Sequence, residues 1–187
     1  DVASSTALNI RGDWNFYGSS SNLTINGKTY KGYLGVMKHG ASGFLSEGYF
    51  HTYQPARHRA LNQDYCHMEG LDYYRAIISY YGADKETKGY IVGTVKDAHN
   101  KMNHSLFTYA PKTNDQWVPC NGAEVILKKA GVEVARYNVD TMYNGIFVFK
   151  DLEPGNDYTL DATCSGYLPL DQEQKVALTV KANETTY

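Results

Sequence analysis

One carboxylate in this chain stands at the end of a hydrophobic run, where it could act as a general base. Glu47 follows a short hydrophobic run and precedes a glycine, two aromatic residues and a histidine, in the order Phe44-Leu45-Ser46-Glu47-Gly48-Tyr49-Phe50-His51. A carboxylate at the end of a buried strand can take a proton from an attacking water and return it to the leaving amine. Glu47 is therefore the best candidate for a catalytic residue in this chain; the alternative is an exposed carboxylate in a turn.

Three further residues lie close to Glu47 in the sequence and are candidates to line a substrate groove. They are Tyr49, His51 and Arg57. Each also has a plain structural explanation. Tyr49 can pack against its neighbours, His51 can be a hydrogen-bonded loop histidine, and Arg57 can be a solvent-facing residue at a helix start. The sequence leaves both interpretations open for all three.

The chain lacks a recognisable set of zinc ligands. Catalytic zinc takes three protein ligands and keeps one open position. The six histidines form neither a His-Glu-x-x-His nor a His-x-x-Glu spacing. Three cysteines, Cys66, Cys120 and Cys164, contain no CxxC pair. We expect all three to be small buried residues, with a Cys120–Cys164 disulfide as the alternative, and we expect no catalytic zinc in this chain alone.

The elements that would position Glu47 are predicted from hydrophobic periodicity. Asn26-Gly27 between β-forming residues predicts a hairpin, and two short buried strands are expected at 33–37 and 43–49. Apolar residues then recur every three or four positions from Leu61 to Ile78. This spacing predicts a helix from about Asn62 to Tyr81, ended by Gly82.

After a polar, glycine-bracketed segment at 82–89, the hydrophobic period changes to two. Turn signals such as Asn144-Gly145 and Glu153-Pro154-Gly155 separate short segments of this kind. Many short strands between such turns predict a β-sandwich. The predicted strands are 90–96, 105–109, 123–128, 132–139, 145–149, 158–164 and 175–181.

This second part resembles the transthyretin-like, carboxypeptidase-regulatory type of sandwich. The resemblance is carried by the segments Gly93-Thr94-Val95-Lys96-Asp97, Asn121-Gly122-Ala123-Glu124-Val125, Tyr143-Asn144-Gly145-Ile146-Phe147-Val148-Phe149, Leu152-Glu153-Pro154-Gly155 and Ser165-Gly166-Tyr167. It covers about half the chain. It implies a fold and says almost nothing about activity.

The first part resembles the end of the catalytic domain of bacterial zinc-dependent N-acetylmuramoyl-L-alanine amidases. The match runs through Leu34-Gly35-Val36-Met37, then residues 43–50, then the helix from Asn62. In that family a strand ending in a Glu-x-Gly-Phe-like motif delivers the catalytic glutamate, and a terminal helix closes the domain. Its zinc ligands, two His and a Glu, come earlier in the domain, so the matching positions would precede Asp1.

These resemblances predict an α+β chain with two parts. Residues 1–85 are expected to be the C-terminal fragment of an α/β zinc-hydrolase domain, and residues 86–187 an accessory β-sandwich. The parent protein would be a peptidoglycan hydrolase that requires zinc, with this fragment inactive alone. A zinc carboxypeptidase parent assigns Glu47 the same role. The remaining alternative is a non-catalytic cell-surface binding or spacer protein.

The composition of the chain indicates which partners and which cellular location to expect. The 187 residues carry a net charge of −2 with scattered Lys and Arg, which argues against nucleic acid as a partner. No apolar run reaches the length that spans a membrane. The 17 Tyr and 17 Gly are typical of extracytoplasmic bacterial proteins. We therefore expect a cell-envelope location, periplasmic or secreted, with peptidoglycan peptide or glycan as the partner.

Overall fold

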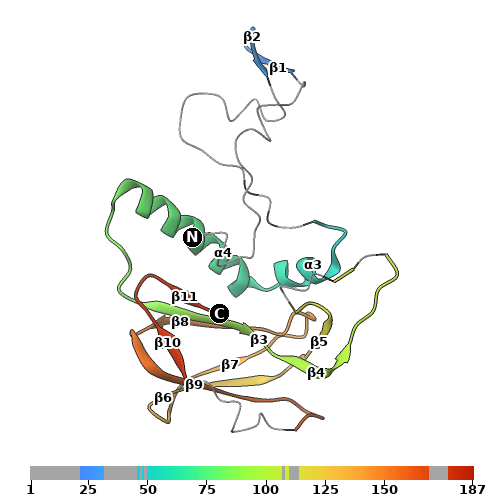
Figure 1. Cartoon of the computed structure of the whole chain (residues 1–187), viewed down its shortest axis with the longest axis vertical. Helices are drawn as coiled ribbons and strands as arrows, with labels where there is room; N and C mark the ends of the chain where they lie inside the picture. Colours follow the sequence, from blue (N-terminus) through green and yellow to red (C-terminus); the bar gives the residue numbers. More distant parts are fainter. Residues whose placement is uncertain are drawn as a thin grey trace. The chain divides into compact units, whose positions relative to one another are not determined.

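The chain has a mixed architecture in which strands predominate over helices, which confirms the broad α+β class (Figure 1). It divides into two compact units, one over residues 8–48 and a larger one that contains residues 49–187. The computed structural model describes residues 22–31, 46, 48, 50–106, 108–109, 114–168 and 177–187. The predicted strands at 33–37 and 43–49 lie outside the described residues, apart from Ser46 and Gly48.

The smaller unit contains the predicted hairpin. Strand β1 (Asn22–Ile25) pairs antiparallel with β2 (Lys28–Lys31). The turn residues Asn26 and Gly27 have φ of 51° and 76°. A two-residue turn with positive φ at both positions matches the right-handed twist of the flanking strands, which is why Asn-Gly is favoured there.

Two helices open the described part of the larger unit. Helix α3 (Gln54–Ala60) has Pro55 in its first turn, where a missing N–H is tolerated. Helix α4 (Gln63–Tyr81) begins after Asn62, whose side-chain oxygen accepts a 2.8 Å hydrogen bond from the backbone N–H of Tyr65. It ends at Gly82, whose φ of 66° is left-handed. The helix predicted over 62–81 is confirmed.

The strands of the larger unit form two main sheets and one short ribbon. The three-stranded sheet has the order β11-β3-β8, with β3 (Gly89–Thr94), β8 (Ile146–Leu152) and β11 (Thr185–Thr186). The four-stranded antiparallel sheet has the order β10-β9-β6-β7, with β6 (Glu124–Lys129), β7 (Val132–Asn138), β9 (Gly155–Thr163) and β10 (Leu178–Val180). The ribbon pairs β4 (Lys96–Lys101) with β5 (Trp117–Pro119).

The main hydrophobic core fills the space between the two sheets. Phe147 and Phe149 of β8 meet Val125 and Leu127 of β6 and Tyr158 of β9 in one buried cluster. Each such side chain contributes roughly 1.5–3 kcal/mol when it leaves water. The two sheets therefore pack against each other around one shared core, and the predicted sandwich stays a prediction beyond that.

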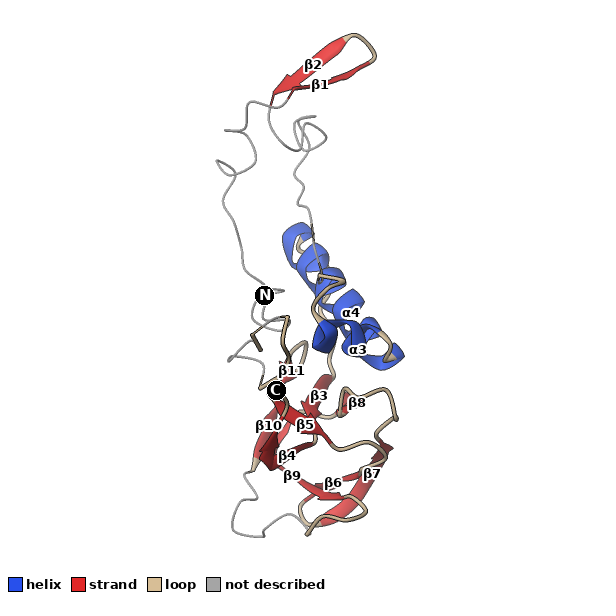
Figure 2. Cartoon of the chain, turned by 90° about the vertical axis from the view of Figure 1, so that its right-hand side faces the viewer, coloured by secondary structure: helices blue, strands red, loops and turns tan. Residues whose placement is uncertain are grey.

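Helix α4 covers the outer face of the three-stranded sheet (Figures 1 and 2). Met68 packs against Val92, Ile146 and Val148 in a second buried cluster. Strand β8 is therefore buried on both faces, which explains why residues 146–149 are apolar without alternation.

Polar contacts from Asp64 and Arg75 hold α4 against neighbouring segments of the larger unit. Asp64 accepts a 2.9 Å hydrogen bond from the Tyr137 hydroxyl and pairs with Lys150. Burial would raise the pKa of Asp64, but these two partners outweigh it and lower the pKa. Further along α4, Arg75 pairs with Glu86 at 2.9 Å and donates to the Thr185 hydroxyl of β11 at 2.8 Å. The predicted division of the chain at residues 85 and 86 into two parts of different origin stays a prediction.

Some sequence-based expectations are wrong. No described residue of the predicted strand 105–109 is in a strand, and Leu106 is 86% exposed, so it lacks the packing that would hold it in a sheet. The predicted strand 90–96 breaks at Val95, because its N–H and carbonyl bond Gly145 and Cys120 instead. Ribbon β4–β5 was not predicted.

The cysteine expectation is also wrong in part. Cys120 is buried and Cys164 is half-buried, but Cys66 is exposed on α4. Its thiol donates to the Ala60 carbonyl at 3.4 Å. All three thiols are free, without a Cys120–Cys164 disulfide.

Candidate functional site

The structure describes two of the four predicted site residues, His51 and Arg57. Glu47 and Tyr49 lie outside the described residues, so their roles stay predictions. His51 is exposed in the turn before α3, and Arg57 is exposed on α3. These two side chains do not line the cavity described next, whereas His58 and Arg59 beside Arg57 do.

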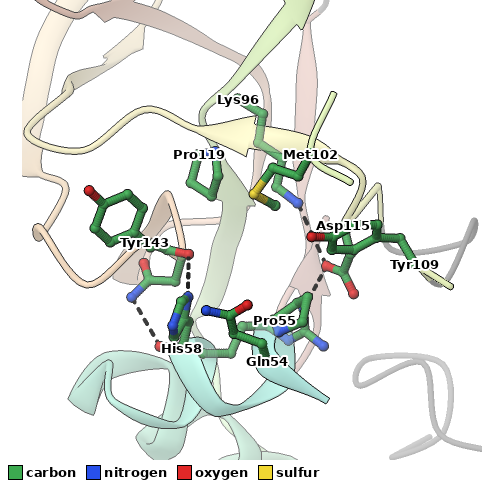
Figure 3. Close-up of a pocket in the computed structure, with 11 residues that line it drawn as sticks. Gln54, Pro55, His58, Lys96, Met102, Tyr109, Asp115, Pro119 and Tyr143 are labelled. Carbon is green, nitrogen blue, oxygen red and sulfur yellow. Dashed lines mark hydrogen bonds and ion pairs between the residues drawn. The ribbon is translucent and has the colours of Figure 1, made fainter. Parts of the chain in front are cut away.

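A cavity of about 340 Å³ lies between α3 and the β4–β5 ribbon (Figure 3). Gln54, Pro55 and His58 project from the helix on one side, and Lys96 and Met102 face them from the other. The remaining lining residues are Arg59, Tyr109, Asp115, Pro119, Tyr143 and Asn144.

Asp115 is the centre of the polar network at this cavity. Its side chain is only 1% exposed. One carboxylate oxygen accepts from Arg59 Nη1 at 2.7 Å, and the other accepts from the Tyr53 hydroxyl at 2.8 Å. A buried carboxylate is stable only when such donors replace its water. The network therefore fixes α3 against the turn that precedes β5.

Lys96 is the second cation of the network. Its Nζ lies 3.7 Å from the Asp115 carboxylate and donates a 2.9 Å hydrogen bond to the Asn114 carbonyl. Burial lowers the pKa of Lys96, although the Asp115 charge acts in the opposite direction. Lys96 is the first residue of β4 and directly follows Val95, whose N–H and carbonyl bond Gly145 and Cys120.

The turn that precedes β8 forms another wall of the cavity. His58 Nδ1 lies 3.3 Å from the carbonyl oxygen of Tyr143. The Asn144 amide donates to the His58 carbonyl at 3.3 Å and to Asp140 at 3.0 Å. Gly145 follows with φ of 69°, and a side chain there would place its Cβ 2.5 Å from the Val95 carbonyl oxygen. The two contacts with His58 therefore hold this turn against α3.

The described residues do not fit a zinc site. Among them, no group of three or more His, Cys, Asp or Glu side chains is close enough to hold a metal ion. The cavity instead contains two cations, one buried carboxylate and apolar walls. That set of groups suits the binding of a small anion.

Comparison with known proteins adds no further assignment. No protein-family model matches the chain, and neither a curated protein nor a solved structure is significantly similar to it. In the part of the chain that the structure describes, neither helix has the length and apolarity needed to cross a membrane.

Sequence reasoning missed the residues that make this cavity polar. Arg59, Lys96 and Asp115 come from three separate segments, and none belongs to a spacing motif. The one available signal was the basic cluster Arg57-His58-Arg59, in which Arg57 and His58 were candidates for a groove but Arg59 was not.

Proposed function

We propose that this chain is the C-terminal part of a zinc-dependent N-acetylmuramoyl-L-alanine amidase of the bacterial cell envelope, joined to a transthyretin-like accessory sandwich. Such an enzyme cleaves peptidoglycan between N-acetylmuramic acid and L-alanine. The observation that carries the proposal is the order of the elements. The run ending in Glu47-Gly48-Tyr49-Phe50 is followed by α3 and by the long helix α4, the order in which this class of hydrolase finishes its catalytic domain.

On this proposal Glu47 is the general base. Its carboxylate takes a proton from the attacking water and returns it to the leaving amine. Tyr49, His51 and Arg57 line the substrate groove. A zinc ion would polarise the carbonyl group and acidify the water. Its ligands come from outside the described residues.

The proposal is tested by replacing Glu47 in the full gene product. Glu47→Gln keeps the shape of the side chain and removes the base, so we expect amide cleavage in muramyl peptides to fall about 10²–10⁴-fold. Glu133→Gln is the matched control, because Glu133 is an exposed strand residue paired with Arg136. Full activity in the Glu47 variant would refute the assigned role.

The same assay distinguishes a parent amidase from the alternative parent, a zinc carboxypeptidase. A zinc carboxypeptidase would release C-terminal residues from peptides and leave the muramyl amide intact. In addition, stoichiometric zinc and hydrolysis by the 187-residue chain alone would show that the metal ligands lie within it.

One observation favours a second candidate, a non-catalytic binding function. The cavity at α3 holds Arg59 and Lys96 next to one buried carboxylate, Asp115. If neither substrate is hydrolysed, binding at this cavity is the function that the described residues support.

A further inference from the structure

We infer that the cavity between α3 and the β4–β5 ribbon binds the terminal carboxylate of a short peptide. This inference uses only residues of the larger unit. It does not depend on the amidase proposal, so either can fail without the other.

The charge of the cavity favours a single negative ligand. Arg59 and Lys96 provide two positive charges, and Asp115 provides one negative charge. The side chains of Arg59 and Lys96 are only 21% and 13% exposed. Charges in such partly desolvated surroundings interact more strongly than in water. A monoanion balances the surplus, whereas Asp115 disfavours a dianion such as phosphate.

The two cations retain hydrogen-bond donors for a ligand. Lys96 has three N–H donors; one bonds the Asn114 carbonyl and another faces Asp115. Arg59 has five N–H donors; it hydrogen-bonds Asp115 and Tyr65, and its charge also interacts with that of Glu69. Charge-assisted hydrogen bonds from such groups to a carboxylate are the stronger kind.

The remaining walls suit the body of a peptide. Pro55, Met102 and Pro119 provide apolar surface, and Gln54 provides an amide for a peptide group (Figure 3). The volume of about 340 Å³ is near the lower end for small-molecule sites. The cavity therefore fits the end of a short peptide.

Titration of the wild-type chain with N-acetyl-alanyl-alanine, in L,L and D,D forms, tests the inference. Two-dimensional NMR should show shifts confined to the cavity, including the side-chain amides of Gln54 and Asn144. The corresponding carboxamide should bind at least about 10-fold more weakly, because it lacks the charge. Inorganic phosphate should also bind more weakly than the dipeptide.

Two variants locate the recognising charge. Lys96→Met keeps the apolar stem and should weaken carboxylate binding about 10-fold. Lys101→Met is the matched control, because Lys101 is an exposed cation of the same strand, stacked on Trp117. It should leave binding unchanged.

Four outcomes would overturn the inference: equal binding of the carboxamide, tighter binding of phosphate, shifts outside the cavity, or no shifts at ~10 mM ligand, which corresponds to negligible affinity. If Lys96→Met fails to fold, the comparison of carboxylate with carboxamide on the wild-type chain decides alone.

Discussion

Replacing Asp115 by asparagine tests whether the buried network at α3 stabilises the larger unit. Asp115 is 1% exposed at its side chain and joins Arg59 of α3 to the turn before β5. Asparagine has the same shape but no charge. It also places an NH₂ group where one oxygen now accepts from Arg59 or from the Tyr53 hydroxyl.

The expected loss can be estimated from the burial of the partners. Removing one member of a buried ion pair costs about 3–5 kcal/mol. Arg59 is 21% exposed at its side chain, so water can partly solvate the orphaned guanidinium. We therefore expect Asp115→Asn to reduce the free energy of unfolding by about 3 kcal/mol, the lower end of that range.

Urea unfolding followed by circular dichroism measures this loss. With a slope of about 2 kcal/mol per molar urea, the midpoint should fall by roughly 1.5 M. A double-mutant cycle with Arg59→Met should give a coupling free energy of roughly 1–3 kcal/mol. Glu133→Gln, at an exposed pair, should leave the midpoint unchanged. An unchanged midpoint for Asp115→Asn, or zero coupling to Arg59, would refute the reasoning.

Three further predictions concern other parts of the larger unit. Maleimide should label exposed Cys66 in the native protein but buried Cys120 only after unfolding. The reason is that burial raises the pKa of the Cys120 thiol to about 11, so little of the reactive thiolate is present. Labelling of Cys120 in the native protein, detected by mass spectrometry, would contradict this prediction. Burial raises the pKa of Tyr137 to about 12, so the folded state keeps this proton to a higher pH than the unfolded state. Between pH ~10 and ~12, the free energy of unfolding of the wild-type protein should therefore fall more steeply than that of Tyr137→Phe, as measured by urea unfolding at each pH. The same pH dependence in both proteins would contradict this expectation. Gly145→Ala should cost about 3 kcal/mol and Gly122→Ala about 1 kcal/mol in urea unfolding. Both glycines have left-handed φ, but only at Gly145 does the added Cβ meet a main-chain carbonyl oxygen, at 2.5 Å; equal losses would show that this contact is relieved.

The elements governed by local interactions were predictable from the sequence. The helix over 62–81 begins at the cap Asn62 and ends at Gly82, and the hairpin turns at Asn26-Gly27. A cap or a tight turn depends on hydrogen bonds and dihedral angles within a few residues, so neighbours in the sequence determine it.

The ribbon β4–β5 was not predictable in the same way. Its strand Lys96–Lys101 is polar and mostly exposed, so it has no alternating pattern. It is a strand because it pairs with residues 117–119, which lie well beyond it in the chain. The apolar segment 105–109 looked more like a strand, but Leu106 has no core to enter.

The cavity at α3 was the least predictable feature. Arg59, Lys96 and Asp115 come together only because α3, the start of β4 and the turn before β5 converge in the folded unit. Charged residues of this kind are common on surfaces, so their type alone gives no signal. The role predicted for Glu47 lies outside the described residues and depends on the sequence pattern alone.

The packing of α4 on the three-stranded sheet has a practical consequence for the preparation of the two main sheets as an isolated fragment. A polypeptide starting at residue 86 would lose Met68 and leave Val92, Ile146 and Val148 facing water. An uncovered apolar area of this kind promotes self-association and precipitation. A fragment that starts before α3 keeps that face covered, so it should self-associate less and be more suitable for crystallisation or NMR.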